Sequence, residues 1–326
     1  MSNLVQRTTA YPPSVKATNV YGHPGLELFV TLRTRNCIKA ETRGSCTFCG
    51  LGNLDGKRPP LGIMEAQLQT EGLIRKLKKS STGLQDFIRI SLISMSDSLL
   101  HPRIIQMEAM KRVLEVIARE FPNVRLISVE SRTDGLIPES LKELGAHIDS
   151  LFGDSVLKEI ACGIETPYPE VRKRIRKFVS DQDLAVAADS IARTGWHEMR
   201  GYFIYNLFEH DSSARIQALK EAVDLMNALR GSIRTSVLVH RAYVPAKLAG
   251  TELFREFTEI GDSDAIPELR EAAKYAKMKP IQFEIDSTCE DQAASSATFC
   301  MGREYREALD RYNRTLDPNE LVLTRS

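Results

Sequence analysis

Three cysteines crowd into one short segment of the chain. Cys37, Cys46 and Cys49 follow the spacing C-x8-C-x2-C, and two thiolates separated by two residues can reach one metal centre across a tight turn. Neighbouring glycines let the backbone wrap closely around such a centre and turn N–H groups toward the sulfurs. The pattern favours an iron–sulfur centre with three protein ligands, which leaves one metal position open for another molecule.

The same spacing leaves two other interpretations open. The thiols could hold a structural zinc ion whose fourth ligand is His23 or His101. They could also lie unligated in a loop. With zinc, the chain would be a zinc-stabilised α/β binding module without redox chemistry.

The other cysteines carry weaker signals. Cys162 lies within an apolar run and is predicted to be buried as a small hydrophobic residue. Cys289 and Cys300 are separated by ten residues, which matches no strong metal spacing. We interpret these two as inert thiols, a redox pair or a substrate-contacting thiol. Six cysteines in 326 residues are too few for a disulfide scaffold.

Composition excludes several classes of protein. Hydrophobic residues make up 42% of the chain and charged residues 27%, as in ordinary globular proteins. The 44 basic and 43 acidic residues create no global field that favours nucleic acid or membrane. No apolar run approaches the roughly 20 residues of a membrane-spanning helix, and the N-terminus lacks a secretory signal. We therefore expect a cytoplasmic protein without a membrane partner.

Short apolar runs alternate with helical patterns along most of the chain. This alternation predicts parallel βαβ units whose helices lie outside a buried sheet. We expect an α/β fold, a partial (β/α)6 TIM-like barrel over residues 26–240, with an extended lead-in over 1–25 that packs on the surface. A helical C-terminal extension over 241–326 is expected to close the barrel. The predicted strands are 26–32, 87–93, 124–129, 157–163, 199–205 and 233–239.

The predicted strands bring polar residues to one edge of the barrel. The cysteine segment directly follows the first strand, and active sites of α/β proteins form where parallel strands end. Glu130 and Arg132 follow the third strand, where they could act on substrate or form a local ion pair. Glu165 ends an apolar strand, and a carboxylate is costly to bury there without a partner. We expect these residues to face the cysteines.

The cysteine segment resembles the cluster-binding motif of the radical S-adenosylmethionine (radical SAM) superfamily, in which an aromatic residue precedes the last cysteine, as Phe48 does. Its longer spacing is similar to the branch that contains the Elongator catalytic subunit. The stretches E-S-R-T-D at 130–134 and G-I-E-T at 163–166 resemble the same branch. Residues 94–102 and Lys177 resemble the radical SAM protein of archaeosine synthesis, a tRNA-modifying relative. The likeness covers residues 30–240, and a six-unit partial barrel is that superfamily's fold.

The resemblance implies that Cys37, Cys46 and Cys49 ligate a 4Fe–4S cluster whose remaining iron binds SAM. Reductive cleavage of SAM then gives a 5′-deoxyadenosyl radical that abstracts hydrogen from a substrate. Glu130 and Arg132 are the implied catalytic residues. The implied cofactor-binding residues are Phe48, Ser94, Met95, Ser96, Asp97, Glu165, Tyr202 and Val237.

Several of these assignments have alternatives. Tyr202, like Phe203 and Tyr205, could instead pack in the core or on the outer face. The basic run 172–177 could be a solvated helix end or could contact phosphates. The substrate could be a modified nucleoside in tRNA or a small metabolite, and the balanced charge gives tRNA no support. We expect an electron donor such as flavodoxin or ferredoxin.

Overall fold

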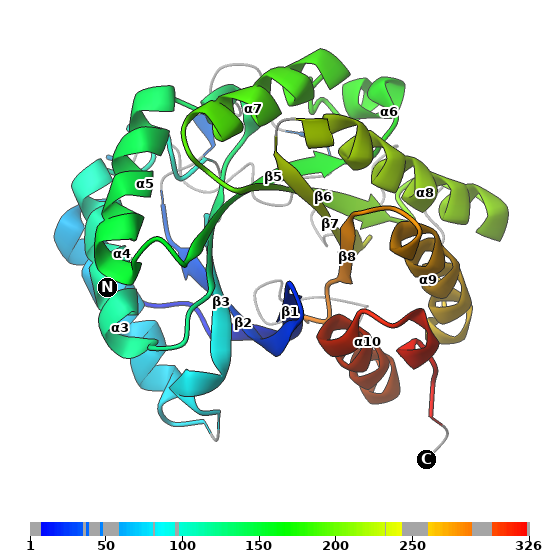
Figure 1. Ribbon diagram of the computed structural model, residues 1–326, viewed down its shortest axis with the longest axis horizontal. Coiled ribbons are helices and arrows are strands. Elements are labelled where there is room, and N and C mark those ends of the chain that lie inside the picture. The colour runs from blue at the N-terminus through cyan, green and yellow to red at the C-terminus, as the bar shows by residue number, and fades with distance from the viewer. Residues whose placement is uncertain are drawn as a thin grey trace.

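Among the residues that the structure describes, eight strands form a sheet that is curled into a partial barrel (Figure 1). The computed structural model describes residues 8–34, 37–38, 46–47, 59–80, 82–94, 98–231, 233–242, 260–288 and 302–324. Strand β1 runs antiparallel to β2, and every following pair from β2 to β8 is parallel. The six predicted strands and the α/β partial barrel are confirmed. The strands are β1 Ser14–Val20, β2 His23–Leu32, β3 Phe87–Ser94, β4 Leu126–Glu130, β5 Leu157–Glu165, β6 Glu198–Tyr205, β7 Arg234–Arg241 and β8 Gln282–Ile285.

Helices surround the outside of the sheet (Figure 1). Residues at the helix ends explain where some of these helices begin. Pro138 begins α5, where a missing N–H costs nothing, and the Asp211 side chain caps α8 by accepting from the Ala214 amide. In the described part of the chain, no helix combines the length and apolar character needed to cross a bilayer. The helices are α3 Ile63–Leu77, α4 Met107–Glu120, α5 Pro138–Phe152, α6 Pro169–Arg174, α7 Asp181–Arg193, α8 Ser212–Ala228, α9 Asp262–Lys277 and α10 Arg303–Thr315.

The sheet extends beyond both expected ends of the barrel. Strand β1 comes from the segment expected to be a lead-in packed on the surface, and β8 from the segment expected to be a helical extension. The lead-in is buried rather than superficial, since Lys16, Ala17 and Thr18 are each at most 1% exposed. Neither strand is an apolar run, because their buried side chains include charged and polar groups. These groups find their partners inside the barrel.

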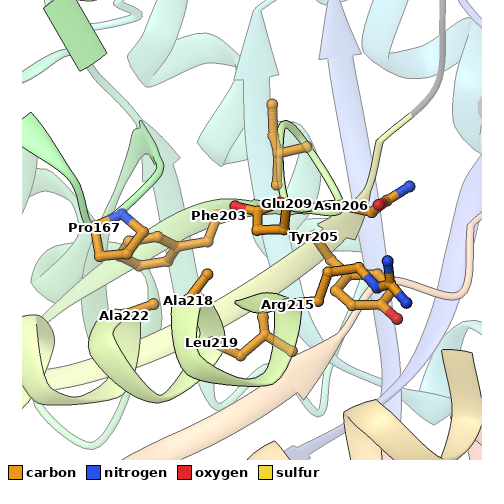
Figure 2. Close-up of a pocket in the computed structure, with 10 residues that line it drawn as sticks. Pro167, Phe203, Tyr205, Asn206, Glu209, Arg215, Ala218, Leu219 and Ala222 are labelled. Carbon is orange, nitrogen blue, oxygen red and sulfur yellow. The ribbon is translucent and has the colours of Figure 1, made fainter. Parts of the chain in front are cut away.

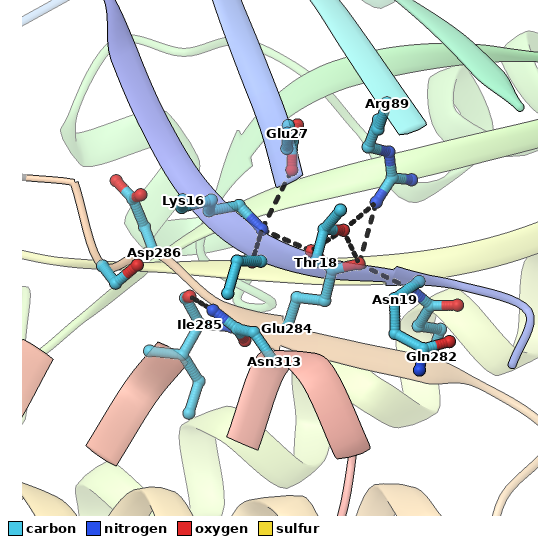
Figure 3. A network of polar contacts seen from close by, with 12 residues as sticks. Lys16, Thr18, Asn19, Glu27, Arg89, Gln282, Glu284, Ile285, Asp286 and Asn313 are labelled. Carbon is cyan, nitrogen blue, oxygen red and sulfur yellow. Dashed lines mark hydrogen bonds and ion pairs between the residues drawn. The ribbon is translucent and has the colours of Figure 1, made fainter. Parts of the chain in front are cut away.

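A network of buried charges fills the barrel interior near the N-terminal ends of the strands (Figure 3). Lys16 Nζ contacts Glu27 Oε2 at 2.9 Å and Glu284 Oε2 at 2.5 Å. Arg200 Nη1 lies 2.8 Å from Glu27 Oε1, and its Nη2 lies 2.6 Å from Glu284 Oε2. Arg89 Nη1 contacts Glu284 Oε1 at 2.8 Å. Because β2, β6 and β8 are not neighbours in the sheet, these side chains must meet across the interior.

Side chains and α10 close the seam between β1 and β8, the two ends of the sheet order. Gln282 on β8 donates to the Asn19 carbonyl on β1 at 2.5 Å. Asn313 on α10 bonds both the amide and the carbonyl of Ile285. Asp310 on the same helix accepts from the Ala17 amide at 3.2 Å. The C-terminal helix therefore supplies hydrogen bonds that the exposed edges of β1 and β8 would otherwise lack.

Candidate functional site

The parallel strands end at one edge of the barrel, which we call the C-terminal rim. Ser94, Glu130 and Glu165 are the last residues of β3, β4 and β5. Cys37 follows β2 by five residues, so it leaves the sheet at the same rim. The structure therefore brings four predicted site residues to one side of the molecule.

Glu130 stabilises the end of the neighbouring strand. Its Oε2 accepts a hydrogen bond from the Ser94 amide at 2.8 Å. The Ser94 hydroxyl lies 2.8 Å from the Thr34 hydroxyl, which follows β2. These contacts tie the ends of β2, β3 and β4 together beside the segment that leads to the cysteines.

Arg132 has an ion-pair partner two residues along the chain. Its Nε and Nη2 donate to the two carboxylate oxygens of Asp134 at 2.8 and 2.7 Å. An incoming carboxylate would have to displace Asp134 to use this planar fork. Arg132 and Glu130 thus both have structural contacts at the rim, in addition to any role toward a ligand.

Glu165 is held in an unusual backbone conformation. Its φ of 74° lies in the left-handed region, next to a register irregularity between β5 and β6. The carboxylate accepts from Lys177 Nζ at 2.6 Å, with the two side chains 13% and 11% exposed. A Cβ on Gly163 would lie 2.5 Å from Glu165 Oε1 and 2.8 Å from Lys177 Nζ. The glycine therefore makes room for this ion pair, and strain of this kind is typical of functional sites.

The cysteine segment packs against the residues that follow α6. The Cys46 thiol lies 3.7 Å from the Arg176 carbonyl oxygen, and the Thr47 amide donates to the Ile175 carbonyl at 3.1 Å. Lys177 is the next residue along. The thiol predicted to hold a metal centre and the Lys177–Glu165 pair therefore adjoin, although 119 residues separate Cys46 from Glu165.

Cys37 and Cys46 have the thiol groups that an iron–sulfur cluster or another thiolate-bound metal centre needs as ligands. Cys37 and Cys46 are partly exposed at the rim, and neither is in a disulfide. Within the described residues, no three potential ligands lie close enough together to hold a metal ion. The expected third ligand, Cys49, is outside the described residues, as are Phe48, Met95, Ser96, Asp97, Cys289 and Cys300.

The proposed zinc ligand His23 lies at the wrong end of the barrel. It begins β2, whereas the cysteines follow the end of that ten-residue strand. Ten residues of strand span about 30 Å, so His23 is too far from the thiols to share an ion with them. In the other proposed zinc ligand, His101, the Nδ1 atom accepts a hydrogen bond from the Arg103 amide at 3.1 Å.

A histidine–aspartate pair lies in the barrel interior near the C-terminal rim. His240 Nδ1, near the end of β7, lies 2.9 Å from Asp286 Oδ2, directly after β8. The Thr288 amide and hydroxyl both donate to Asp286. Burial raises the pKa of Asp286, but His240 and the Thr288 amide lower it more, so the carboxylate is charged.

Tyr202 belongs to this interior group. Its ring meets the His240 ring edge-on at 5.2 Å, and its buried hydroxyl has no hydrogen-bond partner among the described residues. Burial raises the pKa of this hydroxyl, so it is protonated and available as a donor. Tyr202 therefore faces the interior, as its predicted role in cofactor binding requires, rather than the outer layer.

Val237, Phe203 and Tyr205 lie on the other side of the sheet. Val237 is fully buried in the apolar core, and strand alternation turns it away from the interior that His240 faces. Its side chain therefore does not point toward the interior, where the predicted cofactor would lie. Phe203 and Tyr205 line a small cavity against α8 (Figure 2). Its volume of about 10 Å³ admits at most one water molecule, so it is no ligand site.

The remaining predictions have mixed outcomes. Cys162 is fully buried, as predicted, and burial raises the pKa of its thiol to about 12. The basic run is not simply a solvated helix end, because Arg172 is fully buried against Asp181 and Lys177 is bonded to Glu165. A second hollow, lined by Trp196 and Arg234 among others, lies at the N-terminal ends of β6 and β7, away from the cysteines.

The His240–Asp286 pair was not among the predicted site residues. His240 directly follows the apolar run Val237–Val239, which is the same strand-end signal that marked Glu165. Asp286 follows Phe283–Ile285, a run that Glu284 interrupts. The second run was missed because β8 is only four residues long. Lys177 was noted by resemblance, but nothing in its spacing identifies Glu165 as its partner.

Comparison with known proteins gives distant likenesses. No sequence profile of a known protein family matches the chain. Over 166 residues, or 51% of this chain, it is 28% identical to the uncharacterized protein MJ0550 of Methanocaldococcus jannaschii. That match covers 42% of the relative, so the chain spans less than half the length of the curated protein it matches.

Solved structures of similar shape include three enzymes. Methylornithine synthase has a TM-score of 0.49 and 13% identity, covering 82% of this chain and 74% of that one. Spore photoproduct lyase has a TM-score of 0.47 and 10% identity, covering 88% and 86%. Coproporphyrinogen III oxidase of Escherichia coli, described as a radical SAM enzyme, has a TM-score of 0.45 and 15% identity, covering 84% and 55%. With similarities this low, function has to be argued from the chain's own residues.

Proposed function

We propose that this protein is a radical SAM enzyme whose cluster is held by Cys37, Cys46 and Cys49 at the C-terminal rim. When bound, a 4Fe–4S cluster supplies the electron that cleaves SAM to methionine and a 5′-deoxyadenosyl radical, which takes a hydrogen atom from the substrate. The observation that carries the proposal is the contact of Cys46 and Thr47 with residues 175–176. This contact places the cysteine segment next to Lys177, whose ammonium pairs with Glu165, the residue that sequence resemblance assigns to SAM.

The rim residues have separate tasks in this proposal. Glu165 accepts hydrogen bonds from the two ribose hydroxyls of SAM, since one carboxylate can accept both O–H groups. Glu130 fixes the Ser94 amide, and thereby the end of β3 where the segment 94–97 would meet the methionine part of SAM. Tyr202 bounds the interior below the rim, where its buried hydroxyl can donate to a bound molecule.

For the substrate, we propose a polar metabolite or a nucleoside, either alone or within tRNA, as in the Elongator and archaeosine branch. The polar groups in the barrel interior near the C-terminal rim support a polar substrate. Tyr202, His240 and Asp286 offer hydrogen-bonding groups there rather than an apolar surface. An electron donor such as flavodoxin or ferredoxin would reduce the cluster. Substrate candidates can be screened by deuterium transfer from labelled compounds into 5′-deoxyadenosine.

Metal and sulfide analysis tests the cluster assignment. Protein reconstituted without oxygen should hold about four irons and four sulfides per chain. Cys46→Ala should lose most of both, whereas Cys162→Ala should retain them because Cys162 is buried in the apolar core. About one zinc per chain without sulfide would instead support the binding module and contradict the enzyme.

A further inference from the structure

Lys177 connects two parts of the rim that lie far apart in the sequence. Its ammonium donates to Glu165 at 2.6 Å, and the residue before it accepts from the Cys46 thiol through its carbonyl oxygen. Lys177 is 9% exposed, so water screens its charge only weakly. A buried cation therefore lies between the carboxylate and the cysteine segment.

The backbone around Lys177 is shaped to turn its side chain inward. Arg176 and Phe178, on either side, have φ angles of 56° and 52°, in the left-handed region that L-residues rarely adopt. Lys177 faces the rim interior, whereas Arg176 and Phe178 are exposed. Two strained residues flanking one buried lysine indicate that the surrounding structure enforces this position.

The ammonium is stable in its charged form. Burial lowers the pKa of Lys177, but the adjacent Glu165 carboxylate raises it, and the pKa lies above its ordinary value. Gly163 leaves room for the pair, because a Cβ there would lie 2.8 Å from the Lys177 nitrogen. The site therefore keeps a permanent positive charge beside Cys46.

We propose that Lys177 is a positioning residue that orients the Glu165 carboxylate toward SAM and, through its charge, raises the reduction potential of the centre held by Cys46. This inference rests on the proposed function. A positive charge near a cluster favours its reduced state, since reduction adds negative charge, and net charge is one of the factors that set cluster potentials. One side chain would thus prepare both SAM binding and electron uptake.

Charge-changing variants test the two roles separately. Lys177→Met keeps the length of the side chain and removes its charge. We expect unchanged iron and sulfide content, a more negative midpoint potential in an EPR-monitored titration, and SAM binding weakened about tenfold, the size of one charge-assisted hydrogen bond. Lys177→Arg should restore the potential because the charge returns, but only part of the SAM affinity because the geometry differs. Lys173→Met, an exposed neighbour in the same basic run, should change neither.

Glu165→Gln provides a second variant whose potential should move the opposite way. Removing this negative charge should make the midpoint potential less negative, while SAM binding weakens as in Lys177→Met. A loss of stability alone would not produce shifts of opposite sign. This variant also decides the inference if Lys177→Met fails to load a cluster.

Two results would overturn the inference in distinguishable ways. A wild-type cluster that cleaves SAM, together with unchanged potential and SAM affinity in Lys177→Met, contradicts the role of Lys177 alone. Unchanged SAM affinity in Glu165→Gln as well would also contradict the assignment of Glu165 to SAM. A wild-type protein that holds no cluster contradicts the proposed function, and the role of Lys177 with it.

Discussion

Lys16 on β1 and Glu284 on β8 form an ion pair of 2.5 Å between the first and last strands of the sheet. Glu284 also pairs with Arg89 and Arg200, so one carboxylate receives three cations in a region closed to water. Burial raises the pKa of Glu284, but these cations lower it more, to about 2. The closure of the barrel therefore depends on charge as well as on backbone hydrogen bonds.

Glu284→Gln should lower the free energy of unfolding by about 3–5 kcal/mol, because it leaves buried cations without their shared partner. Urea denaturation at pH 7 measures the loss. Since the folded pKa of Glu284 is depressed, its contribution is present above about pH 4.5 and is lost as the pH falls toward 2. Glu120→Gln, which removes a surface pair with Lys78, should cost less than about 1 kcal/mol. Equal losses in the two variants would contradict a structural role for the network.

Glu159 should make stability fall with rising pH. Burial raises its pKa more than Arg89 lowers it, and the nearby Glu198 adds a smaller increase, which gives a pKa of about 7. Because this folded value exceeds the unfolded value of 4.5, the stabilisation is complete below pH 4.5 and is lost as the pH rises through 7. Unfolding free energies of wild type and Glu159→Gln should therefore diverge between about pH 4.5 and 7. A constant difference over that range would show that Glu159 does not titrate there.

Gly163→Ala should disturb the Glu165–Lys177 pair directly. The added Cβ would lie 2.5 Å from Glu165 Oε1 on a sheet strand that has little room to move. We expect a loss of about 1–3 kcal/mol in stability and weaker SAM binding by calorimetry. Gly231→Ala is the matched control, because a Cβ there meets nothing within 4 Å. Full SAM affinity in Gly163→Ala would argue against Glu165 as a ligand-binding residue.

The cysteines should separate by reactivity in metal-free protein. The pKa of the Cys162 thiol is raised to about 12 by burial, so almost no thiolate forms at pH 8. Cys37 and Cys46 are partly exposed. Iodoacetamide at pH 8 should therefore label these two long before Cys162, as peptide mass spectrometry would show. Cys162 labelling as fast as Cys46 in folded protein would be inconsistent with this structure.

The parallel strands could be predicted because each is an apolar run between helical patterns. Strand β1 could not, since its buried Lys16 and Thr18 read as surface residues until Glu284 is known to lie beside them. Strand β8 is only four residues long and contains that glutamate. Polar groups that are buried only through distant partners carry no local signal.

In the candidate site, too, residues with a local sequence signal could be predicted and their distant partners could not. Glu165 and the cysteines were predicted because a strand end and a short spacing are local features. The Lys177–Glu165 pair depends on a contact between separate elements of the fold, which no local feature predicts. The His240–Asp286 pair likewise joins residues that lie 46 positions apart in the chain. The outward direction of the Val237 side chain could not be predicted either, because one residue of register decides which face of a strand a side chain occupies.

The central claim is most directly tested by 5′-deoxyadenosine formation. Reconstituted wild-type protein, reduced with dithionite and given SAM without oxygen, should form 5′-deoxyadenosine and methionine in equal amounts by liquid chromatography and mass spectrometry. Cys162→Ala should do the same, and Cys46→Ala should form neither. Absence of 5′-deoxyadenosine from wild-type protein that carries a full cluster, or equal formation by Cys46→Ala, would contradict the assignment.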